Sequence, residues 1–357
     1  MIKEVTIKNF MAHTNLSCSD IPMINVIIGR NDTGKTGLLK ILYATAKTLE
    51  VYSLKKKSGD VSFKKELADK LQDTFMNRNG LGSLVQKGNR DKLDVNIRFE
   101  LPGKNQQQVI NFSFGDKTES TITHCIELVK ELPEKGMNAL FIPAKEVLTA
   151  FNDIRYIREN FYGRGFDDTY FDLIKALNLE STKGRVADGF SSVNKNLTTL
   201  FEGKIEQTGI QEQPFIFKKG NQQFSMQQTA EGIKKIGILT TLITNRQLGR
   251  GTILFMDEPE TALHPNAIRE LVEMLVAMSR GGVQVFLASH SYFIIKQLAI
   301  CAKRDLINIL CWSLDKVPDQ PVTNSFHDLI DGILPDNSIV NESVDMYNAD
   351  LKVQLGL

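Results

Sequence analysis

Short apolar runs along the chain alternate with stretches whose apolar residues recur at helical spacing. Residues 23–28, 252–256 and 282–288 have the length and composition of strands that are buried on both faces of a parallel sheet. Residues 37–44 and 266–279 place apolar side chains on one helical face, as helices packed on such a sheet do. This alternation predicts an α/β fold with a largely parallel sheet.

Other patterns predict parts that lie outside this sheet. Residues 1–8, 93–100 and 108–114 alternate apolar and polar side chains, which is typical of antiparallel strands with one solvated face. The segment Pro102–Asn105 supplies a turn between the last two strands. Residues 145–208 mix helical periodicity with glycines, and they predict a mainly helical lobe.

Three smaller elements follow from the same reasoning. Residues 138–142 form an apolar strand that Pro143 ends. Residues 215–226 contain a predicted hairpin around Gly220, and a helix is expected from Thr229 to about Arg246.

These patterns divide the chain into four parts. Residues 1–144 form the first lobe of the predicted α/β core, and residues 48–92 are inserted in it. Residues 145–212 form the helical lobe, residues 213–319 complete the core, and residues 320–357 form a C-terminal tail in which no chemical motif is evident.

The insertion, residues 48–92, is basic. It contains ten Lys and Arg residues against six Asp and Glu. Apolar residues at every fourth position of Phe63–Phe75 predict a short amphipathic helix, and the glycines within 80–88 predict a flexible loop. A basic insertion can bind a nucleic-acid backbone. The favoured interpretation is a solvated face, because most charge runs have that role.

The strongest chemical motif is Gly29–Thr36, which matches the phosphate-binding pattern G-x-x-x-x-G-K-[ST]. A predicted strand precedes it and a predicted helix follows, as this loop requires. The backbone N–H groups of such a loop and the helix dipole bind phosphates. Lys35 would contact the β- and γ-phosphates, and Thr36 would hold Mg²⁺ through its hydroxyl. The alternative is an ordinary glycine-rich turn.

A second motif ends the predicted strand 252–256. Asp257 after four apolar residues can hold Mg²⁺, as the Walker-B aspartate does. The adjacent Glu258 can polarise an attacking water molecule. Alternatively, the two carboxylates cap a helix N-terminus.

Two weaker motifs flank the second one. Thr229–Gly232 opens a predicted helix and offers an anion-binding N-terminus, although Thr229 can equally be an ordinary N-cap. Ser289–His290 ends the predicted strand 282–288, where a histidine can contact a γ-phosphate or serve a structural role.

The bulk composition favours a reduced cytoplasmic protein. The chain has 357 residues, 42% of them hydrophobic, and a net charge of +1, which gives no general attraction to DNA or membranes. The four cysteines are scattered without a C-x-x-C pair, so neither a disulfide framework nor a zinc site is indicated. No apolar run approaches the roughly 18 residues that a membrane helix needs.

The order of the motifs resembles that of ABC-type ATPase heads. The start Ile7–His13 together with Gly29–Thr36 resembles SMC-, RecF- and Rad50-like heads. Thr229–Gly232, Asp257–Pro265 and Ser289–His290 are most similar to the small bacterial AAA15/AAA21 ATPases, a group that includes the ATPase parts of OLD-, Septu- and PARIS-type anti-phage systems. The resemblance implies an α/β head with a mixed or parallel P-loop sheet, an antiparallel β part and a mainly helical lobe.

The resemblance also implies which residues form the site. Two heads would bind ATP and Mg²⁺ between them as a homodimer or a higher homo-oligomer, with the loop Glu260–Pro265 at the seam. Glu258 is the expected base, His290 the switch and Asp257 the metal support, while Thr229 and Gly232 would face the partner's γ-phosphate. The remaining nucleotide contacts are expected from Gly29, Asn31, Gly34, Lys35, Thr36 and Gly37.

Some positions depart from the family pattern. The signature element is Thr-Ala-Glu-Gly, and the lobe junction at Pro143–Glu146 lacks a Q-loop glutamine. Asp32 places a carboxylate near a triphosphate, which costs repulsion unless the side chain points away.

The leading functional hypothesis is a slow, regulatory ATPase subunit of an anti-phage complex. ATP-dependent dimerisation would sense a trigger or gate an effector, and too few residues follow His290 for a nuclease domain, so a nuclease or toxin is expected to be a separate chain. The alternative is a RecF-like ATPase that binds duplex DNA through residues 55–92. A transporter ATPase and a scaffold that binds ATP without turnover are further alternatives.

Overall fold

The computed structural model describes residues 1–55, 62–77, 79–88, 90–101, 107–128, 137–161, 165–179, 202–317 and 320–355. Its centre is a six-stranded sheet in which five strands are parallel and β14 is antiparallel. The strand order is β14 (Thr323–Asp328), β13 (Ile309–Asp315), β3 (Ile24–Gly29), β12 (Gln284–Ser289), β11 (Thr252–Asp257) and β7 (Asn138–Ile142). The predicted parallel sheet is therefore confirmed.

A second sheet is antiparallel and has five strands. Their order is β2 (His13–Cys18), β1 (Ile2–Phe10), β4 (Leu93–Glu100), β5 (Gln107–Phe114) and β6 (His124–Leu128). The predicted turn at 102–105 lies outside the described residues. A third sheet of three strands, β8 (Lys204–Gln207), β9 (Phe215–Lys219) and β10 (Gln222–Ser225), contains the predicted hairpin.

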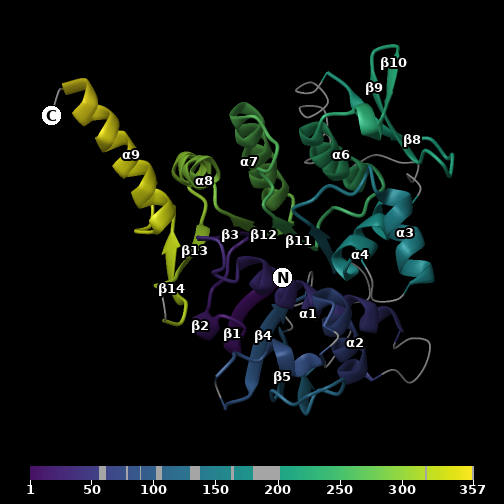
Figure 1. The fold of residues 1–357 in the computed structure, drawn as a ribbon, viewed down its shortest axis with the longest axis vertical. Coiled ribbons are helices and arrows are strands. Elements are labelled where there is room, and N and C mark those ends of the chain that lie inside the picture. Colours follow the sequence, from purple (N-terminus) through teal and green to yellow (C-terminus); the bar gives the residue numbers. More distant parts are fainter. Residues whose placement is uncertain are drawn as a thin grey trace.

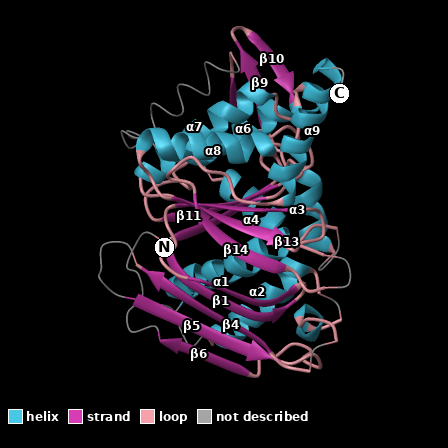
Figure 2. Ribbon diagram, turned by 90° about the vertical axis from the view of Figure 1, so that its left-hand side faces the viewer, coloured by secondary structure: helices cyan, strands magenta, loops and turns pink. Residues whose placement is uncertain are grey.

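The helices cover both faces of the six-stranded sheet (Figure 1). Helices α7 (Pro265–Arg280) and α8 (Tyr292–Asp305) lie on one face, and α1 (Lys35–Lys55) and α2 (Phe63–Phe75) lie between the other face and the antiparallel sheet (Figure 2). The other helices are α3 (Phe151–Asn160), α4 (Asp168–Leu177), α6 (Glu231–Thr244) and α9 (Ser338–Leu355), with short 3₁₀ turns at Leu81–Leu84 and Met226–Gln228.

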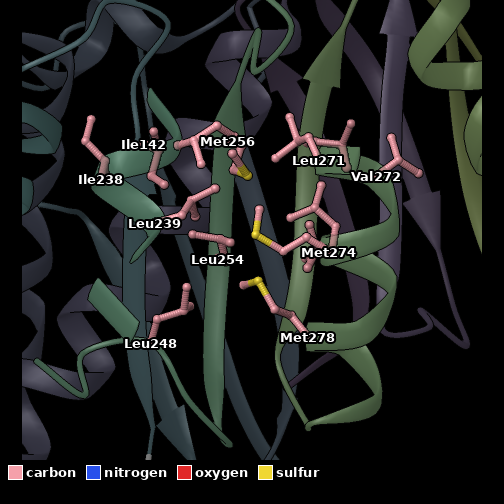
Figure 3. Close-up of a cluster of buried hydrophobic side chains, with 14 of the residues drawn as sticks. Ile142, Ile238, Leu239, Leu248, Leu254, Met256, Leu271, Val272, Met274 and Met278 are labelled. Atoms are coloured by element: carbon pink, nitrogen blue, oxygen red, sulfur yellow. The ribbon is translucent and has the colours of Figure 1, made fainter. Parts of the chain in front are cut away.

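Successive side chains of the central strands point alternately into two hydrophobic cores, one on each face of the sheet. Leu254 and Met256 of β11 pack with Leu271 and Met274 of α7 on one face (Figure 3). Phe255, between them in sequence, belongs to the second core with α1 and the antiparallel sheet. Because both faces of the sheet are covered, β3, β11 and β12 are buried at every position and mostly apolar, which explains their nearly continuous apolar runs in the sequence.

Three sequence expectations differ from the structure in detail. β2 was not predicted, because its sequence is largely polar. Its extended conformation depends on antiparallel pairing with β1. β14 lies in the range predicted as a tail, yet it pairs with β13 along its length, so the core sheet extends beyond residue 320. The expected flexible loop around Gly80 and Gly82 is wrong, because a Cβ at Gly82 would lie 1.9 Å from the backbone oxygen of Asp116. The four-part division of the chain otherwise stays a prediction.

The predicted helical lobe is described in part, by α3 and α4. A buried charge cluster ties α4 to the P-loop helix α1 and to α2. The Lys70 ammonium of α2 lies 2.8 Å from the carboxylate of Asp168 and also pairs with Asp172, which accepts a hydrogen bond from the hydroxyl of Tyr43. Burial raises the pKa of Tyr43 well above its ordinary value. Lys70 therefore neutralises two carboxylates that the lobe junction removes from water.

We expect K70A to lower the free energy of unfolding by about 3–5 kcal/mol, because it removes the ammonium group that pairs with the buried Asp172 and leaves Asp168 with Arg158 as its remaining ion pair. Urea unfolding measures this change. K3A is the matched control, since it removes the lysine of the exposed Lys3–Glu100 pair and should cost only about 0–1 kcal/mol. Equal losses in the two variants would contradict the role assigned to the buried cluster.

Candidate functional site

The carboxyl ends of three neighbouring parallel strands bring the predicted site residues to one edge of the sheet. β3 leads into the loop Gly29–Thr36, β11 ends at Asp257, and β12 ends at Ser289. Ser289 pairs with Ile28, and Asp257 pairs with Ala288, so the three ends are in register. Ligands of open parallel sheets bind at this edge.

Two glycines of the loop lie so close to neighbouring residues that a side chain would not fit. A Cβ at Gly29 would lie 2.5 Å from the carbonyl oxygen of Leu314, and one at Gly34 would lie 2.5 Å from the Nε2 atom of His13. Gly34 also has a φ of +84°, which favours glycine. Both positions therefore require glycine for the phosphate-binding conformation.

Lys35 begins α1 and is turned back onto the loop. Its ammonium donates to the carbonyl oxygens of Gly29 at 2.6 Å and Arg30 at 2.8 Å. Burial lowers the pKa of Lys35, and the carboxylates of Glu258, Asp257 and Glu260 oppose that shift. The lysine thus lies within the field of three acidic groups that follow β11.

Thr36 and Asp257 form the candidate magnesium site. The Thr36 hydroxyl donates to both carboxylate oxygens of Asp257, at 3.0 and 3.1 Å. A hydroxyl and a carboxylate are the hard oxygen donors that Mg²⁺ prefers, and such sites complete the shell with water and phosphate. These two residues fit the ion that the motifs imply.

The remaining predicted loop residues are at the surface. Asn31 is exposed, and Gly37 lies in the first turn of α1 beside Met11. The exposed carboxylate of Asp32 pairs with Lys316, which follows β13, and this pairing lowers the pKa of Asp32. The expected repulsion from the triphosphate is therefore reduced by a lysine that carries no signal in the sequence.

Glu258 and His290 face each other across the ends of β11 and β12. The Nδ1 atom of His290 lies 3.3 Å from a carboxylate oxygen of Glu258 and 3.9 Å from one of Glu260. Glu258 has a φ of +45°, and its N–H donates to the carbonyl oxygen of Ala288 at 2.9 Å. This backbone conformation is strained for a residue other than glycine, and it holds the carboxylate beside the His290 ring.

The helix-opening motif lies beside this turn but is arranged differently from the expectation. Thr229 is buried, and its hydroxyl donates to the carbonyl oxygen of Ser225 at 2.8 Å. Gly232 lies against the loop after β11, where a Cβ would be 3.1 Å from the carbonyl oxygen of Ala262. The predicted contacts of Thr229 and Gly232 with a second copy stay a prediction.

Two residues of the site were missed in the sequence. Lys235 of α6 donates to the carbonyl oxygen of Glu258 at 2.7 Å, so it joins the helix opened by Thr229–Gly232 to the turn after β11. Glu260 is buried and accepts hydrogen bonds from Ser289 and His290. Lys235 has no sequence signal, whereas Glu260 was expected only to lie at a dimer seam.

Comparisons with known proteins identify a family for most of the chain. Residues 24–296 match the family model described as "AAA domain, putative AbiEii toxin, Type IV TA system". The Old nuclease of Escherichia phage P2 is 50% identical over 40 residues, which are 11% of this chain and 7% of that protein. The match thus spans a small part of either protein.

Solved structures of SMC heads share the fold. The SMC head bound to the C-winged helix domain of ScpA has a TM-score of 0.57 and 13% identity, with 92% of this chain and 98% of that chain covered. An Smc head with an extended coiled coil, bound to the C-terminal domain of ScpA derived from Pyrococcus furiosus, has a TM-score of 0.50 and 11% identity, with 92% and 96% covered. The predicted likeness to SMC heads is confirmed for the fold, and the family model that matches describes an AAA domain.

The described part of the chain contains no helix that is long and apolar enough to cross a membrane.

The ionised carboxylate of Asp257 affects the stability of the fold in a way that depends on pH. Burial raises the pKa of Asp257 above its usual 3.8. The folded state therefore holds the proton more readily than the unfolded state. The stability that this gives is full below about pH 4 and is lost as the pH rises through the folded pKa. At neutral pH the ionised carboxylate is thus a cost to folding.

We expect D257N to raise the free energy of unfolding at neutral pH by about 1 kcal/mol, within the range of single stabilising substitutions, because the amide replaces a carboxylate whose burial raises its pKa. The gain should shrink as the pH falls toward about 4, because the wild-type carboxyl is then neutral too. Urea unfolding at several pH values, without nucleotide, measures it. A D257N protein that is less stable than wild type at neutral pH would contradict this balance.

Proposed function

The chain belongs to the AAA domain family whose model matches its residues 24–296, and from that premise we propose that it is a slow ATPase whose ATP-dependent dimerisation gates a separate effector in anti-phage defence. The observation that carries the proposal is the meeting of Lys35, Thr36, Asp257, Glu258 and His290 at one sheet edge.

The side chains have separate roles in the proposed hydrolysis. Lys35 leaves the carbonyl oxygens of Gly29 and Arg30 and binds the β- and γ-phosphates. Thr36 and Asp257 hold Mg²⁺, which neutralises phosphate charge when bound. Glu258 orients the attacking water and accepts its proton. His290 contacts the γ-phosphate, so its position depends on whether that phosphate is present.

The exposed loop after β11 supports a second copy as the partner. Thr261 and Ala262 are exposed in the loop that follows the candidate base, and Gly232 lies against Ala262. A surface made of these residues and the phosphate loop would close over nucleotide when two copies meet. Dimerisation would then be the output of ATP binding, and hydrolysis would reverse it.

The relatives support the effector and the defence role. The family description names a toxin of a toxin–antitoxin system, and the local match is to a phage-encoded nuclease. We therefore propose a nuclease or toxin, encoded separately, as the partner.

The RecF-like alternative has less support from the described residues. Its evidence was the basic segment 55–92. Lys70 of that segment is buried against Asp168 and Asp172, and Lys55 pairs with Glu66. Lys56 and Lys57 lie outside the described residues. Internal ion pairs reduce the positive charge that a DNA backbone would meet.

We expect E258Q to bind Mg²⁺-ATP but to lower kcat at least about 100-fold, because it removes the general base. Phosphate release measures turnover. The same variant should accumulate as a dimer with Mg²⁺-ATP in multi-angle light scattering. K35A is the control that should lose ATP binding and remain monomeric. Wild-type phosphate release at the level of a no-enzyme blank would overturn the proposed ATPase.

The effector is tested by tagging this chain and expressing it with its neighbouring genes. We expect a nuclease or toxin chain to co-purify, and its yield should differ between E258Q and K35A if ATP state controls the assembly. Recovery of the tagged chain with no such partner in any nucleotide state would overturn the proposed gating role.

A further inference from the structure

Glu260 is a buried carboxylate in which one oxygen accepts hydrogen bonds and the other has no partner among the described residues. The side chain is 8% exposed at the carboxyl ends of β11 and β12. Its Oε1 atom accepts from the Ser289 hydroxyl at 2.7 Å and from the His290 N–H at 3.2 Å. Its Oε2 atom is buried and has no hydrogen-bond partner among the described residues. Such an oxygen is costly unless a donor reaches it in another state.

The positive charges near Glu260 do not satisfy that oxygen. Two buried ammonium groups, those of Lys35 and Lys235, lie within its field. Burial lowers the pKa of Lys235, and the carboxylate of Glu260 is the strongest of the effects that oppose the shift. Both lysines donate to backbone carbonyl oxygens instead of to Glu260.

The ring of His290 is a donor close to Glu260. Its side chain is 49% exposed, so the ring has room to turn about its side-chain bonds. The Nδ1 atom is 3.3 Å from a carboxylate oxygen of Glu258 and 3.9 Å from Oε1 of Glu260, so the ring lies between the two carboxylates and a rotation can bring it to either. The backbone of His290 stays fixed during this rotation, because Oε1 of Glu260 holds its N–H.

We propose that Glu260 positions His290 for the reaction. Its Oε1 atom fixes the Ser289–His290 turn, and its Oε2 atom accepts the Nδ1–H of the ring when Mg²⁺-ATP binds. The ring thereby leaves Glu258 free to orient water, and its Nε2 atom turns toward the γ-phosphate. This inference rests on the proposed ATP hydrolysis.

The competing interpretation is that Glu260 only braces the turn through Oε1. The variant E260Q separates the two, because its amide oxygen can still accept from Ser289 and His290 while an NH₂ group replaces Oε2. Bracing alone predicts wild-type behaviour for E260Q. Positioning predicts a loss, because an NH₂ group cannot accept the Nδ1–H of the ring.

We expect E260Q to keep its affinity for Mg²⁺-ATP within about twofold and to lower kcat by about tenfold to a hundredfold, since misplacing a catalytic group by 1 Å can cost about a hundredfold. E260D, which keeps the charge but draws it back by one methylene group, is the second variant and should show the same loss. E273Q is the matched control, because Glu273 accepts hydrogen bonds from Arg304 away from the site.

A direct readout follows the ring itself. The chain has five histidines, so ring ¹³C-labelled histidine gives few NMR signals, and H290Q identifies that of His290. A non-hydrolysable ATP analogue with Mg²⁺ should move the His290 signal in wild type and E273Q. In E260Q the analogue should bind without that movement.

The outcomes separate this inference from the function it rests on. If wild type hydrolyses ATP and folded E260Q or E260D has an unchanged kcat, the role of Glu260 is overturned and the proposed ATPase is not. The same holds if the His290 signal changes in E260Q as it does in wild type. Absence of hydrolysis by wild type overturns both.

Discussion

The site depends on the parallel register of β3, β12 and β11. Strands that run in one direction end at one edge, and the pairing of Ile28 with Ser289 and of Asp257 with Ala288 fixes how far each chain segment extends past it. A slip of one residue in any of these strands would turn every side chain to the opposite core. Because Phe255 and Met256 bury themselves on opposite faces, the cores resist such a slip.

This constraint has an electrostatic consequence. The edge gathers Asp257, Glu258 and Glu260 within a partly buried space, where like charges repel strongly. Lys35 and Lys235 offset that repulsion while their ammonium groups remain bound to backbone oxygens. The two lysines therefore balance part of the negative charge that the strand register gathers at this edge.

Much of the fold could be predicted because its signals are local. The buried strands β3, β11 and β12 are mostly apolar, and the phosphate loop needs glycine because of its backbone geometry and close contacts. β2 and β14 have no such signal in their own sequences, because their extended conformation depends on pairing with β1 and β13. The glycines at 80 and 82 show the same limit, as glycine marks either freedom or close packing and only the neighbouring backbone decides which.

The sequence by itself determined the phosphate loop, the carboxylates after β11 and the histidine after β12, because each motif lies within a few residues of a recognisable strand end. Only the tertiary structure decided the roles of Lys235, Lys316 and Glu260. It also directs the Thr229 hydroxyl to the carbonyl oxygen of Ser225. The reason is physical: the cost of a charge and the partner of a donor depend on burial and on distance in space. Packing sets both, and a linear sequence records neither.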